Sequence, residues 1–365
     1  MTDTLERRCA RLFMVGFPGP VLDDGVKALI DGGIFGAILF KRNVGTPPEL
    51  SQLTRALKAH AGRPFALAVD QEGGRVARLR GAPFTALPPM RELGASKDEA
   101  LLERAGRLLA REVRAVGFDW DFAPVLDVDT NPKNPVIGDR SFSRDAQEVA
   151  RFGVALARGM EAEGVASCAK HFPGHGDTAK DSHVDLPTLP HDLKRLREVE
   201  LVPFHAYARA KLSSVMTAHV IFEALDRGVP ATMSKPVLKL LREELGFDGV
   251  LVSDDVEMKA IAEHYKIEEA VVQGTTAGVD LFLVCHQAEV QRRAIGALVK
   301  AVKDGRVSEA RLDEAHRRLA VFEQRFVKPW ADGLSALGAK DHLALAHGLE
   351  AGRVRGKDPT EVAPA

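Results

Sequence analysis

Short apolar runs recur along the chain and alternate with longer segments of helical periodicity. Eight of these runs predict β-strands, at residues 12–16, 36–40, 65–70, 118–126, 165–170, 213–219, 249–253 and 280–285. Most of them are continuously apolar, which is typical of parallel strands that are covered on both faces. The pattern therefore favours an α/β protein in which helices pack against a parallel sheet.

The segments between the runs carry apolar residues at helical spacing. Residues 49–61 place Leu50, Leu53 and Leu57 on one face, and Gly62 follows at a position where helices commonly end. The same periodicity predicts helices at residues 100–116, 146–163, 235–245, 267–277 and 290–304. One further short helix is predicted at residues 339–350.

Eight strands alternating with helices predict a (β/α)8 TIM-type barrel, with an open doubly wound sheet as the alternative. The barrel is favoured because polar residues follow strands all along the chain, among them Asp70, Asp127, Lys170, His219 and Asp254. In an open sheet such residues would gather near one switch point. We expect a single catalytic barrel at residues 1–328 and a C-terminal extension at 329–365, whose charged end, 352–365, is frayed.

Composition narrows the possible partners. The chain has 365 residues, 50 Lys and Arg, and 51 Asp and Glu, so its net charge of −1 gives no electrostatic footprint for nucleic acid or an anionic membrane. Its three cysteines are too few for a disulfide framework. The apolar run at residues 12–17 is too short for a signal peptide, and no stretch is long enough to span a membrane. We expect a cytoplasmic monomer that acts on a small molecule.

The segment KHFPGHGDTAKDSHVDLP, residues 170–187, gathers titratable groups directly after a predicted strand. Asp181 and His183 are two residues apart, so the carboxylate can orient the imidazole and raise its pKa, which suits a proton donor and acceptor. The histidines also permit a metal site. However, Pro173 and Gly174 disfavour the helix that would place His171 and His175 on one face. A metal-dependent barrel hydrolase stays an alternative.

Acidic and basic residues follow other strands in positions that suit a binding site. Asp254, in VLVSDDVEM, is placed to be a nucleophile or metal ligand, and because side chains alternate along a strand, one of Asp254 and Asp255 should make structural bonds instead. Asp70 and Arg78, in DQEGGRVARL, suit a grip on sugar hydroxyls or an acidic ligand. Arg140, in IGDRSF, could bind a carbonyl or carboxylate or lie on the surface.

Together KHFPGHGDT with DSH, VDQEGGRV, APVLDV with IGDRSF, and LVSDD resemble the motifs of family 3 glycoside hydrolases. The resemblance covers residues 10–325 and is strongest to the single-domain bacterial β-N-acetylglucosaminidase branch. It implies a (β/α)8 barrel that removes terminal β-linked N-acetylglucosamine from peptidoglycan-derived saccharides with retention of configuration. It implies no cofactor and no metal.

Residue by residue, the resemblance assigns the nucleophile to Asp254 and the acid/base to His183 paired with Asp181. It assigns substrate binding to five residues: Asp70, Arg78, Arg140, Lys170 and His171. Four alternatives remain open: attack by the substrate's own acetamido group, phosphorolysis at the same site, the metal-dependent hydrolase, and a catalytically silent sugar-binding barrel.

Overall fold

A closed barrel of eight parallel strands forms the centre of the protein. The computed structural model describes residues 4–179, 186–329, 333–349 and 357–360. In sequence order the strands are β1 (Phe13–Val15), β2 (Gly36–Leu39), β3 (Ala66–Val69), β6 (Trp120–Asp121), β7 (Cys168–Phe172), β9 (Ser214–Thr217), β11 (Val250–Asp255) and β12 (Leu281–Val284).

The neighbours in the sheet run β6-β3-β2-β1-β12-β11-β9-β7. Parallel bridges from Trp120 to Ala166 and from Val125 to Lys170 join the two outer strands and close the barrel. The predicted (β/α)8 fold is confirmed, and each strand lies within or overlaps its predicted range. The fourth is much shorter than predicted, because after Asp121 the chain keeps only isolated bridges to its neighbour.

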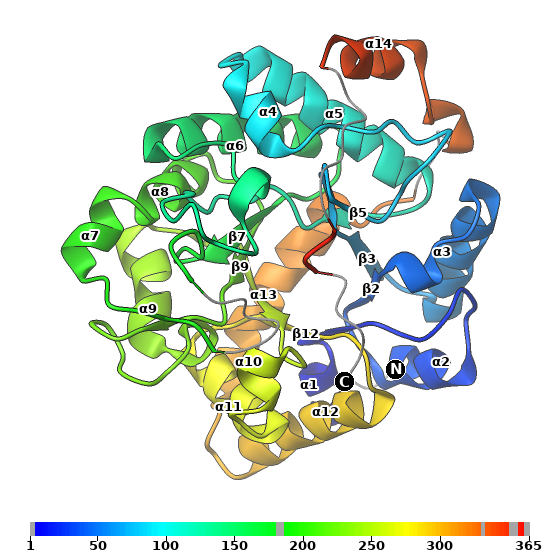
Figure 1. Ribbon diagram of the computed structural model, residues 1–365. Coiled ribbons are helices and arrows are strands. Elements are labelled where there is room, and N and C mark those ends of the chain that lie inside the picture. The colour runs from blue at the N-terminus through cyan, green and yellow to red at the C-terminus, as the bar shows by residue number, and fades with distance from the viewer. Residues whose placement is uncertain (1–3, 180–185, 330–332, 350–356, 361–365) are drawn as a thin grey trace.

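Helices surround the strands on all sides (Figure 1). The outer helices are α1 (Leu5–Ala10), α2 (Asp24–Gly32), α3 (Pro47–Ala61), α5 (Glu99–Ala115), α6 (Ala146–Ala162), α8 (Leu201–Arg209), α9 (Lys235–Lys239), α11 (Ile267–Ala277), α12 (Ala288–Lys303) and α13 (Glu309–Phe326). The predicted helix at 235–245 is α-helical only as far as Lys239 and continues as a π-helical turn, Leu240–Glu244.

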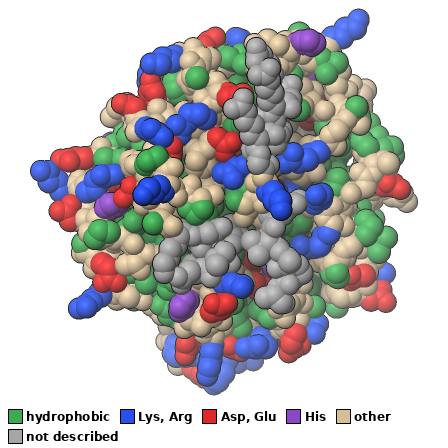
Figure 2. Space-filling model, viewed as in Figure 1, with side chains coloured by type: hydrophobic (Ala, Val, Ile, Leu, Met, Phe, Trp, Pro, Cys, Tyr) green, Lys and Arg blue, Asp and Glu red, His purple; other side chains and the backbone are tan. Residues whose placement is uncertain are grey.

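Shorter elements lie in the loops. They are α4 (Met90–Ala95), α7 (Leu193–Glu198), α10 (Lys259–Ala262), α14 (Lys340–Gly348), the antiparallel pair β4 (Gln71–Gly73) and β5 (Val76–Ala77), and the parallel pair β8 (Thr188–Leu189) and β10 (Ile221–Phe222). Figure 2 shows basic, acidic and hydrophobic side chains interspersed on the viewed face, with several Lys and Arg side chains near its centre. No helix among the described residues has both the length and the apolar character that crossing a bilayer requires.

Local sequence explains where the helices begin and how closely they pack. Side chains of Asp23, Asp98 and Asp145 accept backbone N–H groups at the starts of α2, α5 and α6, which satisfies donors that the helices leave unpaired. α5 and α6 cross closely at Gly106 and Gly159, where an added Cβ would lie about 2.0 Å from a backbone oxygen of the other helix. Only glycine permits this distance.

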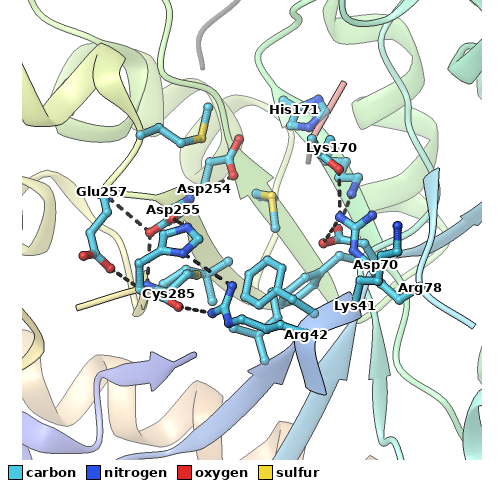
Figure 3. Close-up of a pocket in the computed structure, with 18 of the residues that line it drawn as sticks. Lys41, Arg42, Asp70, Arg78, Lys170, His171, Asp254, Asp255, Glu257 and Cys285 are labelled. Carbon is cyan, nitrogen blue, oxygen red and sulfur yellow. Dashed lines mark hydrogen bonds and ion pairs between the residues drawn. The ribbon is translucent and has the colours of Figure 1, made fainter. Parts of the chain in front are cut away.

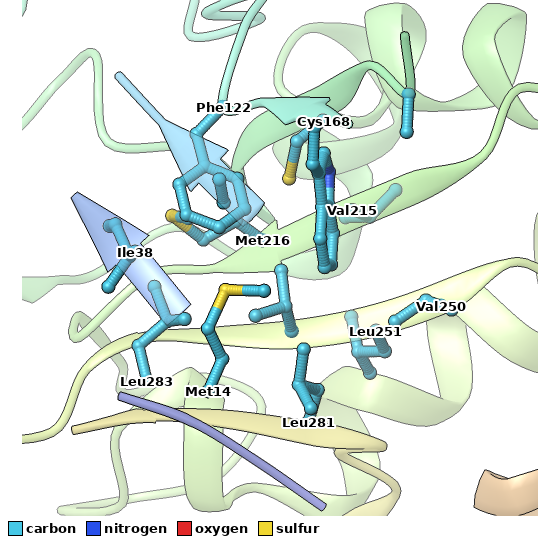
Figure 4. Packing of buried hydrophobic residues seen from close by; sticks show 14 of the residues in the cluster. Met14, Ile38, Phe122, Cys168, Val215, Met216, Val250, Leu251, Leu281 and Leu283 are labelled. Atoms are coloured by element: carbon cyan, nitrogen blue, oxygen red, sulfur yellow. The ribbon is translucent and has the colours of Figure 1, made fainter. Parts of the chain in front are cut away.

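The inside of the barrel is filled by apolar side chains from its strands (Figure 4). Met14, Met216, Leu281 and Leu283 are at most 2% exposed. Trp120 is also buried there, and its indole N–H donates to Ser214 Oγ at 3.0 Å. The three cysteines are free and buried. Because this packed centre leaves no channel, the open space lies beyond the carboxyl ends of the strands.

The C-terminal end differs from its prediction in one respect. α14 falls within the expected helical range, 339–350. The prediction of fraying at 352–365 is wrong for residues 357–360, because the Asp358 side chain is only 6% exposed and pairs with Arg78 across the barrel mouth. Asp358 and Thr360 both accept hydrogen bonds from Arg78, and composition alone does not indicate such a partner.

Candidate active site

The strand ends bring six of the predicted site residues to one cavity of about 640 Å³. Asp70 directly follows β3, Lys170 and His171 lie in β7, and Asp254 lies in β11. Arg78 follows β5, and Arg140 ends a 3-10 turn, Gly138–Arg140. Figure 3 shows Asp254 on one side of the cavity and Asp70, Arg78 and Lys170 on the other. The other two predicted residues, Asp181 and His183, lie outside the described residues.

A buried network of ion pairs forms one side of this cavity. Arg140 binds Glu72 with two parallel hydrogen bonds, each of 2.8 Å. Lys170 Nζ lies 2.7 Å from Glu72 Oε1 and 2.9 Å from Asp70 Oδ1. Arg78 Nη2 lies 3.2 Å from Asp70 Oδ2. Each charge therefore has an opposite partner, which burial at this depth requires.

The network holds its members in their charged forms. Burial favours the neutral form of Lys170, but Asp70 and Glu72 outweigh burial and raise the pKa of its ammonium group. Burial likewise opposes ionisation of Glu72, yet Arg140 and Lys170 lower the pKa of that carboxyl. A row of fixed donors and acceptors results, and such a row suits the hydroxyl groups of a sugar.

His171 is held by a carboxylate that lies behind it. Its Nδ1 is 2.7 Å from Asp127 Oδ2, and Asp127 Oδ1 accepts the backbone N–H groups of His171 and His175. Asp127 is fully buried. Burial alone would raise its pKa, but His171 outweighs burial and the pKa is lowered. The charged carboxylate fixes the ring, so His171 presents Nε2 in a defined direction.

Asp254 and Asp255 differ in their surroundings although both line the cavity. Asp254 Oδ1 accepts the backbone N–H of Asp255 at 2.8 Å. Asp255 Oδ1 accepts backbone N–H groups from Glu257 and Cys285, so Asp255 makes the structural bonds expected of one member of the pair. Asp255 Oδ2 also lies 3.1 Å from His286 Nε2, and this hydrogen bond raises the pKa of His286.

Some residues near the predicted motifs lie elsewhere. Arg75, three residues before Arg78, pairs with Asp139 at 2.8 Å. His175 hydrogen-bonds Thr178 at 2.8 Å, and burial, with His171 nearby, lowers its pKa to about 4. His219, one of the polar residues that follow strands, is buried and is not among the residues that line the cavity. In the described part of the chain no three His, Cys, Asp or Glu side chains group as metal ligands.

The sequence did not single out three features of this site. The sequence indicates Asp127 only as a residue that follows a strand, although that strand neighbours the strand of the KHF motif and could have suggested the contact with His171. The pair of Asp255 and His286 joins residues 31 positions apart, and Arg78 contacts Asp358 from 280 positions away. No local pattern indicates contacts over such separations.

The fold and the site define a (β/α)8-barrel enzyme whose chemical groups stand at the carboxyl ends of the strands. Residues 4–322 match the glycosyl hydrolase family 3 N-terminal domain. The chain therefore belongs to glycosyl hydrolase family 3 and is a glycoside hydrolase. This confirms the family predicted from the motifs.

Relatives and solved structures agree with this assignment. A beta-hexosaminidase of Thiobacillus denitrificans is 43% identical over 283 residues, which cover 76% of this chain and 78% of that protein. A family 3 β-N-acetylglucosaminidase structure from Paenibacillus sp. str. FPU-7 matches 95% of this chain and 68% of its own, with a TM-score of 0.90 and 40% identity. NagZ from Neisseria gonorrhoeae, solved with N-trifluoroacetyl-D-glucosamine, matches 93% of this chain and 96% of its own, with a TM-score of 0.77 and 33% identity.

The network predicts a pH-dependent contribution to stability. We expect Glu72→Gln to lower the free energy of unfolding by about 3 kcal/mol at pH 7, since it leaves buried cations without a full counter-charge. Because folding lowers the pKa of Glu72, the unfolded chain takes up the proton first as the pH falls. The difference between variant and wild type should therefore shrink below about pH 4.3, the ordinary pKa of Glu.

Urea unfolding at several pH values measures this difference. Glu103→Gln is the matched control, since Glu103 pairs with Arg107 on the surface and the change should cost at most about 0.5 kcal/mol at any pH. A pH-independent loss in Glu72→Gln would show that its charge is not what stabilises the site.

Proposed function

We propose that the protein is a retaining exo-β-N-acetylglucosaminidase. The observation that carries the proposal is the cavity itself, in which a strand-end carboxylate, Asp254, faces a fixed set of charged donors and acceptors. Membership of family 3 and the β-hexosaminidase relatives support the same activity. The complex of Neisseria gonorrhoeae NagZ with N-trifluoroacetyl-D-glucosamine, an N-acylated glucosamine, supports N-acetylglucosamine as the sugar.

In the proposed reaction a carboxylate oxygen of Asp254 attacks the anomeric carbon of the sugar. The bond from that carbon to the leaving oxygen breaks, and the leaving oxygen takes a proton from His183, which Asp181 orients. Water then attacks the same carbon and gives a proton to His183, and the ester bond to Asp254 breaks. Two displacements restore the original configuration.

The ion-pair network has a separate task in this proposal. Asp70, Arg78, Arg140, Lys170 and His171 hold the hydroxyl groups of the non-reducing sugar. Because they are fixed by one another before the sugar arrives, little ordering is needed when it binds. The energy of binding is then available to hold the anomeric carbon close to Asp254.

We further propose that the natural substrate is a peptidoglycan-derived saccharide and that water, not phosphate, is the acceptor. The wild-type enzyme should release free N-acetylglucosamine from a GlcNAc–anhydro-muramic acid disaccharide faster than from chitobiose. Adding phosphate should leave the product unchanged. Chromatography of the products from both disaccharides, with and without phosphate, measures this.

Preference for chitobiose would contradict the proposed aglycone while leaving the reaction type intact. Formation of N-acetylglucosamine 1-phosphate would instead identify a phosphorylase that uses the same residues.

Asp254→Asn should reduce turnover by about a thousand-fold or more, since it removes the attacking group. A 2-deoxy-2-fluoro glycoside with a good leaving group should label Asp254 in the wild type, as peptide mass spectrometry can determine. Asp255→Asn is the adjacent control: it loses structural bonds but should still be labelled at Asp254. A label on Asp255 or Glu257 would overturn the assignment, and no adduct at all would favour attack by the substrate's acetamido group.

His183→Ala should slow substrates with poor leaving groups by about 10²- to 10⁴-fold and activated aryl glycosides much less, since only the former need a proton donor. His286→Ala is the matched control, because His286 also pairs with an aspartate at the cavity, at 3.1 Å from Asp255. Comparison of kcat/KM across aryl leaving groups shows which of the two histidines is the proton donor. A leaving-group-dependent loss in His286→Ala alone would move the acid role to His286.

A further inference from the structure

The C-terminal segment 357–360 lies across the barrel mouth and contacts the proposed sugar site. Figure 1 shows it over the centre of the barrel, next to β5. Arg78 Nη1 donates to Asp358 Oδ2 at 2.5 Å, and Arg78 Nη2 donates to Thr360 Oγ1 at 2.7 Å. Thr360 is held in turn, since its backbone N–H and its hydroxyl both donate to Asp358 Oδ1.

Asp358 completes the charge balance of the site. The buried cations are Arg78, Arg140 and Lys170, whereas Asp70 and Glu72 supply only two negative charges. Asp358 is the third carboxylate. Burial disfavours the charged form of Arg78, yet Asp70, Asp358 and Glu72 outweigh burial and raise its pKa. Without Asp358 the ion-paired residues would be three cations and two carboxylates, with a net positive charge.

The segment borders the cavity without filling it. Thr360 lines the same cavity as Asp70, Lys170 and Asp254, and about 640 Å³ remains open among them. This volume lies within the range of pockets that bind small ligands. An inhibitory plug would occupy the space in front of Asp254, whereas here Asp358 and Thr360 stand against Arg78 at the side.

We propose that segment 357–360 is one wall of the sugar-binding site, in which Asp358 positions Arg78 for the sugar and Thr360 completes the wall. This inference rests on the proposed N-acetylglucosamine site. It adds a specificity-determining element, segment 357–360, to the binding residues that the barrel itself supplies. Asp358 acts through Arg78 and is a positioning residue.

Steady-state hydrolysis of 4-nitrophenyl N-acetyl-β-D-glucosaminide by the full chain tests the proposal. Asp358→Ala should raise KM about ten-fold, as expected for loss of a charge-assisted hydrogen bond, and change kcat by less than about three-fold. Thr360→Val should raise KM by a smaller factor, and Asp358→Asn should lie between Asp358→Ala and wild type. Asp341→Ala is the control, because Asp341 is an exposed residue of α14 that does not line the cavity, and its KM should equal that of wild type.

A double-mutant comparison separates positioning from a general structural role. In an Arg78→Ala background, Asp358→Ala should cause almost no further rise in KM, since its effect passes through the missing guanidinium. A lower KM or a higher kcat/KM in Asp358→Ala would identify an inhibitory segment and overturn the proposal. Unchanged kinetic constants, or an equal loss in both backgrounds, would also overturn it.

The same variants distinguish failure of this inference from failure of the proposed function. If the wild type hydrolyses the glycoside and the variants have the same kinetic constants, the inference fails and the proposed function stands. If the wild type does not hydrolyse the glycoside, the proposed function fails. Calorimetric binding of N-acetylglucosamine to wild type and Asp358→Ala then decides the inference, since equal affinities overturn it and an affinity about ten-fold weaker in the variant supports it.

Discussion

The bidentate pair between Arg140 and Glu72 is the contact on which the rest of the site depends. Glu72 also pairs with Lys170, Lys170 pairs with Asp70, and Asp70 pairs with Arg78. This chain of contacts joins three cations that come from different loops and strands. Burial makes this chain of contacts obligatory, because an unpaired charge at this depth would be costly. The packed barrel beneath it supplies the fixed positions from which these side chains start.

The two sides of the cavity are built for different tasks. One side is a rigid network in which every charge is balanced, and it suits recognition of a neutral, hydroxyl-rich ligand. On the other side Asp254 extends from β11 and accepts the backbone N–H of Asp255. Because Asp254 lies across the cavity from Arg78 and Lys170, those cations are balanced by the carboxylates of the network rather than by Asp254. This separation supports the proposed roles of Asp254 as the nucleophile and of the network as the sugar-binding side.

Individual residues show which features of the site local sequence patterns predict and which they do not. Asp70, Lys170 and Asp254 could be placed because each ends a continuous apolar strand, and parallel strands bring such ends together. Arg75 and Arg78 are only three residues apart in one motif, but the β4–β5 hairpin turns Arg75 toward Asp139 and Arg78 toward Asp70. The length of β6 was overestimated because residues 122–126 remain apolar and buried after regular pairing stops. Asp181 and His183 stay predictions, since they lie outside the described residues.

By itself, the sequence determined the barrel, the order of its strands and the set of polar residues at their ends. These features follow from the period of apolar residues and from motifs that are continuous in the chain. Only the tertiary structure decided which charges pair, that Asp127 stands behind His171, and that Asp358 reaches Arg78. These contacts join residues 44 and 280 positions apart. Electrostatic attraction depends on the distance between two charges in space. Separation along the chain does not give that distance, because these residues come together only when the barrel closes.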